Sequence, residues 1–216
     1  MTSIAIIDYG MGNLRSVAKA LEHIAPDADI TVTDQADAIR AADRVIFPGV
    51  GALRDCMTQI RTLNLVDVIG EVAATKPFLG ICLGMHALLH HSEENGGTPG
   101  LGLINGTVKL FSKTMRDAAS GDSLKIPHMG WNHVQHTQNH PLWRDIADDA
   151  RFYFVHSYYV ALDNQAQCVG TTAYGQPFTS ALAAGNIFAV QFHPEKSQRA
   201  GLTLLRNFIY WQGNDQ

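Results

Sequence analysis

Apolar residues in the first 82 positions alternate between two patterns. Short apolar runs predict β-strands at residues 4–7, 29–33, 44–47 and 77–81. Apolar residues at helical spacing predict helices over residues 14–24, 53–61 and 65–73, the first with Asn13 as its N-cap. Strands that alternate with helices are typical of a parallel sheet covered by helices on both faces.

The second half of the chain is richer in strands. Strand-like runs separated by Gly or Asn turns occupy residues 103–111, 152–161, 167–173, 178–183 and 187–192, and an apolar-faced helix is predicted over 202–211. We therefore expect an α/β fold in three layers, with a central, mostly parallel sheet, helices on both faces and an antiparallel hairpin extension. No Pro/Gly/Ser-rich linker interrupts it, which predicts a single domain over residues 1–216.

Composition narrows the possible partners and surroundings. The 216 residues are 46% hydrophobic with a formal charge of −4 and no basic block, which argues against binding to nucleic acid or to an anionic membrane. The three cysteines, Cys56, Cys82 and Cys168, are too few and too widely spaced for a disulfide framework or a CxxC zinc site. No targeting segment is expected ahead of the first strand, and a reducing, cytoplasmic setting fits best.

The stretch Gly80-Ile81-Cys82-Leu83-Gly84 joins a predicted strand to a helix. This is the pattern of a nucleophile elbow with sulfur in place of oxygen, in which the glycines permit a sharp turn. The helix start favours the thiolate of Cys82, and the backbone N–H of Leu83 is an expected oxyanion donor. The simpler interpretation, a small buried cysteine, does not account for the flanking glycines.

A cysteine nucleophile needs a base, and His193 is the best candidate. It ends an apolar strand, and Pro194 keeps it extended, so that His193 and Glu195 point to the same side. Glu195 is then placed to orient the imidazole toward Cys82. The alternative is an ordinary strand-ending turn.

These two motifs together resemble the class I (triad) glutamine amidotransferases. Further blocks similar to members of that family occupy residues 8–14, 48–51, 127–132, 153–159 and 193–197, so the resemblance spans nearly the whole chain. It implies that Cys82, His193 and Glu195 hydrolyse L-glutamine through a glutamyl thioester, releasing glutamate and ammonia without a metal or other cofactor.

The resemblance also implies the residues around glutamine. Gly49, Val50 and Gly51 would form the oxyanion strand. Glu94 and the backbone of Ser157 and Tyr158 would hold the amino-acid end of the substrate. The family usually has Gln at the substrate-contacting position of His86, and an imidazole offers fewer hydrogen-bonding groups than an amide.

Members similar in these blocks pass ammonia to a (β/α)8-barrel synthase subunit in a heterodimer, and 216 residues leave no room for such a barrel of ~250 residues. The interface residues expected from the resemblance are Met11, Asn13, Arg15, Trp131, Tyr153 and Lys196. Two alternatives stay open because of His86: a glutaminase that serves another acceptor synthase, such as a sugar amidotransferase, or a noncatalytic, glutaminase-like regulatory module.

Other histidines in the chain suggest less. His86, His90 and Glu94 fall at i, i+4 and i+8, which would place three metal-ligand residue types on one helix face, but the elbow explains the helix better and no metal is expected. His133, His136 and His140 lie in a polar stretch and are expected to be solvated.

Overall fold

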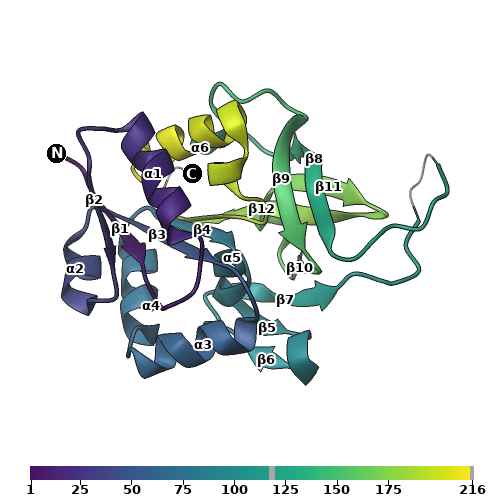
Figure 1. Cartoon of the computed structure of the whole chain (residues 1–216), viewed down its shortest axis with the longest axis horizontal. Coiled ribbons are helices and arrows are strands. Elements are labelled where there is room, and N and C mark those ends of the chain that lie inside the picture. The colour runs from purple at the N-terminus through teal and green to yellow at the C-terminus, as the bar shows by residue number, and fades with distance from the viewer. Residues whose placement is uncertain (117–119, 215–216) are drawn as a thin grey trace.

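Parallel strands form one end of the sheet in the computed structural model, which describes residues 1–116 and 120–214. Their order is β2-β1-β3-β4-β13 (Figure 1). Their bounds are β1 Ser3–Ile7, β2 Asp29–Thr33, β3 Arg44–Gly49, β4 Phe78–Cys82 and β13 Ile187–Val190. The central strands β3, β4 and β13 are buried throughout, which explains why they read as continuous apolar runs in the sequence.

The extension continues from β13 as β12-β10-β7-β5-β6, and β11, β8 and β9 branch from β12. All pairs beyond β13 are antiparallel except β5 with β7. The bounds are β5 Leu89–Ser92, β6 Thr98–Pro99, β7 Ile104–Leu110, β8 His128–His136, β9 Ala150–His156, β10 Tyr158–Leu162, β11 Cys168–Tyr174 and β12 Gln176–Ala184. The expected fold class is therefore confirmed.

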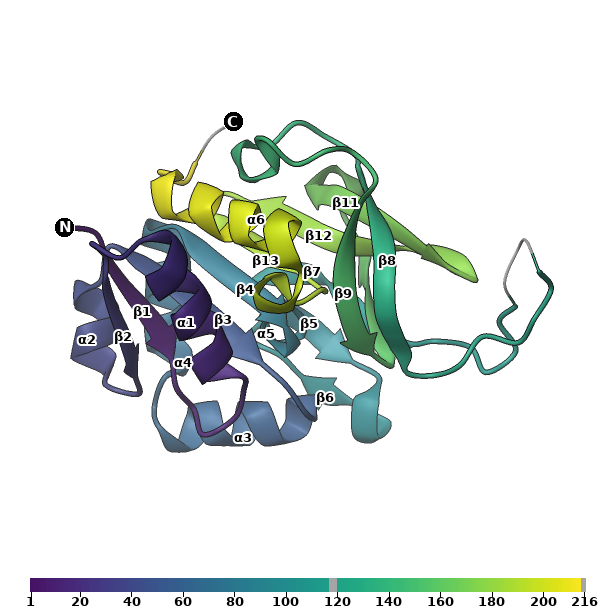
Figure 2. The ribbon, with the colours of Figure 1, turned by 45° about the horizontal axis from the view of Figure 1, so that its top comes forward.

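Helices cover both faces of the sheet (Figure 2). On one face lie α1 (Leu14–Ile24) and α6 (Gln198–Tyr210), and on the other α2 (Ala36–Ala41), α3 (Leu53–Thr62), α4 (Val66–Thr75) and α5 (Leu83–Leu88). Each face has its own buried apolar cluster, and burial of each large aliphatic or aromatic side chain contributes about 1.5–3 kcal/mol. Short 3₁₀ helices occupy Glu94–Gly96, Pro141–Trp143, Gln165–Gln167 and Pro194–Lys196.

The strand predicted over residues 152–161 and the predicted N-cap of the first helix both differ from the structure. The run predicted as one strand over 152–161 is two strands, β9 and β10, which separate at Ser157 and pair with different neighbours. β-Propensity continues across this break, so the sequence pattern does not reveal it. Asn13 stands at the N-cap of α1, but its side chain accepts a 2.7 Å hydrogen bond from the Ser16 hydroxyl instead of capping the helix.

Three central strands bring the site together at one edge of the sheet. β3 ends at Gly49 and β4 at Cys82, which are register partners, and β13 leads directly into Gln191, Phe192 and His193. The carboxyl ends of parallel strands are the usual place for a binding crevice in such sheets. Within the part of the chain that the structure describes, no helix is both long and apolar enough to span a membrane.

Candidate active site

The elbow at Cys82 has an unusual backbone conformation. Cys82 has φ 54° and ψ −108°, and helix α5 starts at the next residue. The residue with positive φ is therefore the cysteine itself, and the flanking glycines permit the turn through their lack of a side chain. Gly84 permits close packing: a Cβ there would lie 1.9 Å from the carbonyl oxygen of Phe47. Gly80 similarly faces the side chains of Ala189 and Leu88 at about 3 Å.

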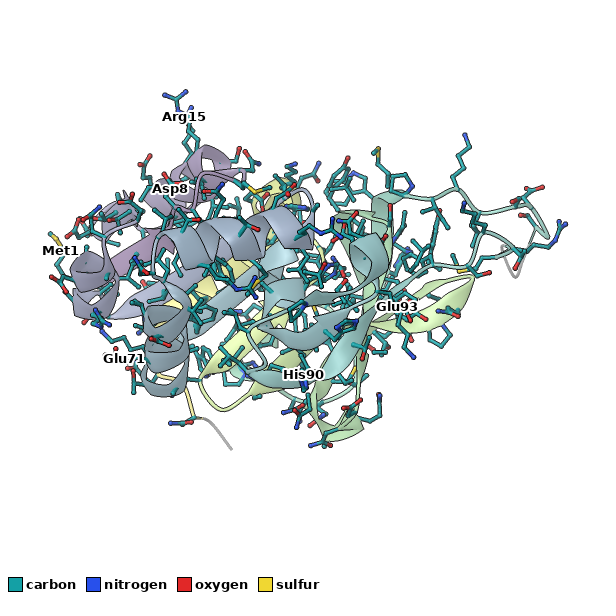
Figure 3. All side chains as sticks on the ribbon, turned by 90° about the horizontal axis from the view of Figure 1, so that it is seen from below. Met1, Asp8, Arg15, Glu71, His90 and Glu93 are labelled. Atoms are coloured by element: carbon teal, nitrogen blue, oxygen red, sulfur yellow. The ribbon has the colours of Figure 1, made fainter. Side chains whose placement is uncertain are left out.

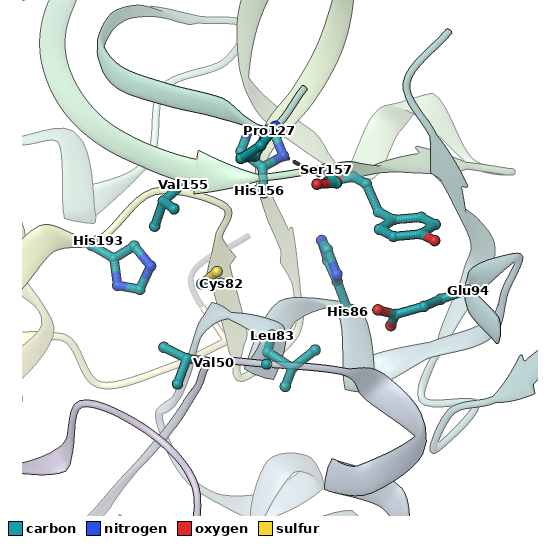
Figure 4. Close-up of a pocket in the computed structure, with 12 residues that line it drawn as sticks. Val50, Cys82, Leu83, His86, Glu94, Pro127, Val155, His156, Ser157 and His193 are labelled. Carbon is teal, nitrogen blue, oxygen red and sulfur yellow. Dashed lines mark hydrogen bonds between the residues drawn. The ribbon is translucent and has the colours of Figure 1, made fainter. Parts of the chain in front are cut away.

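His193 and Glu195 form a buried pair beside the elbow. Nδ1 of His193 lies 2.9 Å from Oε1 of Glu195, and the two side chains are 2% and 0% exposed. A carboxylate can only accept, so Nδ1 carries the hydrogen. Nε2 of His193 is buried and has no hydrogen-bond partner among the described residues, which leaves it available to the cavity beside Cys82 (Figure 4).

The electrostatics of this pair favour a protonated imidazole. Burial lowers the pKa of His193, but the nearby Cys82 and Glu195 outweigh burial and raise that pKa to about 10. A thiolate at Cys82 and the Glu195 carboxylate both stabilise the imidazolium. The site therefore suits a nucleophilic sulfur paired with a proton donor.

Cys82 opens onto a cavity of about 380 Å³, within the size range of small-molecule sites. Its lining is Val50, Gly51, Cys82, Leu83, His86, Glu94, Pro127, Val155, His156, Ser157, Tyr158 and His193. Every expected residue of the triad and the glutamine site therefore lines it except Glu195, which stands behind His193, and Gly49. In Figure 4, Cys82 lies between His193 and His86, and Glu94 and Ser157 lie farther from His193.

The far end of the cavity is held by contacts between separate segments. Oε2 of Glu94 accepts a 2.8 Å hydrogen bond from the backbone N–H of Leu53 at the start of α3. His156 donates from Nδ1 to the carbonyl oxygen of Tyr158 at 2.7 Å, which fixes the turn at Ser157 between β9 and β10. A carboxylate at Glu94 and the backbone of the cavity-lining residues Ser157 and Tyr158 suit the ammonium and carboxylate groups of an amino acid.

Behind His156 lies a second buried histidine. With Nδ1 of His156 donating, its Nε2 accepts, and Nδ1 of His128 donates to it at 2.9 Å. Burial lowers the pKa of His128 to about 4 and that of His156 well below its usual range. Both rings are therefore neutral at pH 7.

His86 is also a neutral, buried ring. Its Nε2 lies 2.7 Å from Oε1 of Gln191, whose Nε2 lies 3.8 Å from the sulfur of Cys82. Burial lowers the pKa of His86 to about 4, although the Gln191 contact opposes the shift. His86 thus lines the cavity and is also linked to Cys82 through the side chain of Gln191.

Sequence reasoning missed four residues of the site: Pro127, Val155, His156 and Gln191. The first three lie inside the sequence blocks 127–132 and 153–159, and this position in the blocks could have identified them as site residues. Gln191 stands two residues before His193 on the same extended segment, a spacing that places both on one side.

The metal alternative does not fit the structure. Helix α5 ends at Leu88, and His90 lies exposed on β5, so His86, His90 and Glu94 do not share a helix face. The chain leaves the helix at Leu89 to pair with β7. Among residues 1–116 and 120–214, no group of three or more metal-ligand side chains could hold a metal ion.

Of the histidines expected to be solvated, His133 is exposed as expected, whereas His136 and His140 are half-buried against other rings. His133 lies 2.8 Å from the backbone oxygen of Asp149, and His136 stacks on Trp143 at 4.4 Å between ring centres. His140 packs at 4.6 Å from Phe188. His133 and His136 lie on β8, which ends at His136, and His140 is the N-cap of the 3₁₀ helix Pro141–Trp143.

The expected interface residues form two groups near the triad. Trp131 and Tyr153 are cross-strand partners with ring centres 6.2 Å apart, and Lys196 Nζ lies 5.9 Å from the Tyr153 ring centre. We call Trp131, Tyr153 and Lys196 the aromatic–lysine patch. Met11, Asn13 and Arg15 are on the β1–α1 connection and the start of α1; Asn13 Nδ2 lies 3.5 Å from Glu195 Oε1, and Arg15 extends away from the protein (Figure 3).

Comparison with known proteins gives a consistent family. Residues 5–211 match the family Glutamine amidotransferase class-I. "Imidazole glycerol phosphate synthase subunit HisH" of Pseudomonas putida is 57% identical over 213 residues, covering 99% of this chain and 99% of that protein. The protein of the same name from Methylococcus capsulatus is 57% identical over 213 residues, with 98% of each covered.

Solved structures agree on the fold. The structure of PurLQS from Thermotoga maritima has a TM-score of 0.71 at 16% identity, covering 97% of this chain and 98% of that one. A crystal structure of a glutamine amidotransferase has a TM-score of 0.69 at 15% identity, covering 96% and 97%.

Proposed function

This chain belongs to the class I glutamine amidotransferases, and from that premise we propose that Cys82, His193 and Glu195 are the catalytic triad with which it hydrolyses L-glutamine to glutamate and ammonia. The observation that carries the proposal is the geometry at the elbow. The buried carboxylate of Glu195 holds Nδ1 of His193 at 2.9 Å, and the other ring nitrogen has no hydrogen-bond partner among the described residues and lies at the cavity that Cys82 lines. In this proposal residues 1–216 form a single glutaminase domain.

The chemistry follows from the charges at the site. The sulfur of Cys82 attacks the carboxamide carbon of glutamine, and the developing oxyanion is stabilised by the N–H of Leu83 and by the strand Gly49–Gly51. Imidazolium His193 gives its proton to the leaving nitrogen, so ammonia departs and a glutamyl thioester remains. His193, now neutral, takes a proton from water, the hydroxide attacks the thioester, and glutamate leaves as Cys82 regains its thiolate.

The remaining cavity residues match the other groups of glutamine. Glu94 bears a negative charge suited to the α-ammonium group, and the backbone of Ser157 and Tyr158 offers hydrogen bonds to the α-carboxylate. His86 lies between these groups and Cys82 in Figure 4, along the span that the glutamine side chain would occupy.

The acceptor of the ammonia is the cyclase/synthase subunit of imidazole glycerol phosphate synthase, a (β/α)8 barrel that forms a heterodimer with this chain. Its products are imidazole glycerol phosphate and an aminoimidazole carboxamide ribotide in histidine biosynthesis. Support comes from full-length relatives at 57% identity that carry the name of this synthase's subunit.

The docking surface for this synthase subunit is the aromatic–lysine patch together with Met11, Asn13 and Arg15. Aromatic side chains are enriched in protein interfaces, and Trp131 is 41% exposed.

Replacement of Cys82 tests whether this chain supplies the ammonia and the partner subunit carries out the synthesis. Cys82→Ser in the complex should abolish glutamine-dependent synthesis and leave ammonia-dependent synthesis intact, since ammonia bypasses the thioester. Loss of both activities in a complex that still assembles would contradict the proposal.

Labelling of Cys82 by a glutamine-analogue electrophile such as diazo-oxo-norleucine separates an active glutaminase from a noncatalytic module. Co-purification of the partner identifies the acceptor synthase.

A further inference from the structure

The site contains a buried amide that the triad mechanism does not use. Gln191 is the first residue after β13 and is 0% exposed. Its backbone N–H donates a 2.9 Å hydrogen bond to the carbonyl oxygen of Ser180 on β12, which ties it to the sheet. Its side chain does not line the glutamine cavity.

The local chain direction explains where the amide points. In an extended segment, residues two apart share a side. Phe192 packs against Phe152, with ring centres 4.1 Å apart, whereas Gln191 and His193 both turn toward Cys82. The same short segment therefore contributes two side chains to the nucleophile.

Hydrogen bonding determines which end of the amide faces the sulfur. Nε2 of Gln191 donates to Cys82 Sγ at 3.8 Å, and Oε1 lies 2.7 Å from Nε2 of His86. An amide oxygen only accepts, so the neutral His86 ring donates from Nε2. The two contacts form a directional chain from His86 through Gln191 to Cys82.

We propose that Gln191 is a positioning residue for the nucleophile: its amide N–H holds the sulfur of Cys82 in place, and His86 fixes the orientation of that amide. An N–H donor beside the sulfur stabilises the thiolate and limits its rotation. A rotated amide would instead direct its oxygen at the sulfur and oppose the negative charge. His86 thereby has a second role besides lining the cavity.

The inference rests on Cys82 being the glutaminase nucleophile, so the main measurement does not require turnover. The alkylation rate of Cys82 by iodoacetamide, with the modified peptide identified by mass, reports the reactivity of the sulfur directly. Gln191→Met keeps the length of the side chain but removes the donor. We expect this rate and kcat for glutamine hydrolysis both to fall about tenfold or more, with KM within about twofold, because Gln191 is outside the cavity.

Variants at His86 test the chain of contacts. His86→Leu should slow alkylation, His86→Gln should restore most of the rate by supplying an N–H, and the double variant H86L/Q191M should be no slower than Q191M alone. Thr172→Val is the matched control, since this buried hydroxyl has no hydrogen-bond partner among the described residues.

Three outcomes would overturn the proposal. The first is alkylation of folded Q191M at the wild-type rate. The second is additive effects of the His86 and Gln191 changes. The third is an equal loss in T172V. If Q191M does not fold, H86L and H86Q decide alone, because both keep Gln191. If the variants change the alkylation rate of Cys82 as predicted while the wild-type protein hydrolyses no glutamine, that result would contradict the proposed function and not this inference.

Discussion

The hydroxyl of Tyr9 donates a 3.0 Å hydrogen bond to the carbonyl oxygen of Pro48, the residue before the proposed oxyanion strand Gly49–Gly51. Tyr9 is fully buried, and burial raises the pKa of its hydroxyl, so it remains a donor at all physiological pH values. The same hydroxyl oxygen is 2.3 Å from where a Cβ on Gly49 would stand. Tyr9 therefore supports the oxyanion strand and also explains why its first residue is glycine.

Tyr9→Phe should destabilise the fold by about 1–2 kcal/mol, because the buried carbonyl of Pro48 loses this partner and the ring is otherwise retained. Urea unfolding measures the change. Hydrogen exchange at the amides of Val50 and Gly51 should become faster as the strand loosens. An unchanged unfolding free energy together with unchanged exchange would show that the hydroxyl does not support the strand.

Gly49→Ala should cost more, about 2–4 kcal/mol, since the added methyl group collides with the Tyr9 hydroxyl and lies 2.9 Å from Cβ of Leu83. Tyr9→Phe removes only the first collision. The double variant should therefore be more stable than the sum of the two single changes predicts, as urea unfolding of all four proteins would show. Strict additivity would contradict this reading of the packing.

Glu195→Gln should lower the pKa of His193 from about 10, because a negative charge that favours the imidazolium is removed. We expect kcat for glutamine hydrolysis to fall about 10²-fold or more, with little change in KM, since Glu195 does not line the cavity. NMR titration of the ring and steady-state kinetics provide the measurements. An unshifted titration would show that Glu195 does not control the charge of His193.

The same pair makes stability depend on pH. The pKa of His193 is raised above its ordinary value of 6.5, so the imidazolium stabilises the fold fully below pH 6.5, and this contribution is lost as pH rises toward 10. In Glu195→Gln the loss should be complete at a lower pH. Unfolding free energies between pH 6 and pH 10 compare the two proteins, and superimposable pH profiles would argue against the coupling.

Trp131→Ala and Lys196→Ala should each weaken binding of the synthase subunit about tenfold or more, the effect expected for anchors at the centre of an interface. Tyr210→Ala is a matched control, because Tyr210 is 72% exposed and lies at the end of α6, whereas Lys196 lies just before its start. Calorimetric titration measures the affinities. Equal losses in all three variants, or none at Trp131 and Lys196, would place the interface elsewhere.

Local sequence patterns were enough to single out Cys82 and His193 as the candidate nucleophile and base, and the structure places both on one cavity. Cys82 lies in a motif whose glycines, strand and helix are adjacent in the chain, and His193 and Glu195 are two residues apart, so short-range geometry determined the prediction. Continuous apolar runs likewise identified β3, β4 and β13 because both faces of these strands are buried.

Contacts between distant segments could not be predicted in this way. The bond between His86 and Gln191 joins residues 105 positions apart, and it depends on β4 and β13 being neighbours. The end of helix α5 at Leu88 was missed for a similar reason, because the following residues leave the helix to pair with β7, which is more distant in the sequence. The pattern of Leu88 and Leu89 is compatible with either helix or strand.

The backbone of Cys82 predicts a conflict between stability and function. Its φ of 54° and ψ of −108° are rarely adopted by residues with a Cβ, and such conformations cost about 1–3 kcal/mol. Cys82→Gly and Cys82→Ala both remove the sulfur, but only glycine relieves the strain. We therefore expect the Gly variant to be more stable than the Ala variant by about 1–2 kcal/mol in urea unfolding, an order that the N-cap position of Cys82 also favours. The strain would then be a cost that the chain bears to present its nucleophile at the tip of the elbow, and an Ala variant more stable than the Gly variant would rule it out.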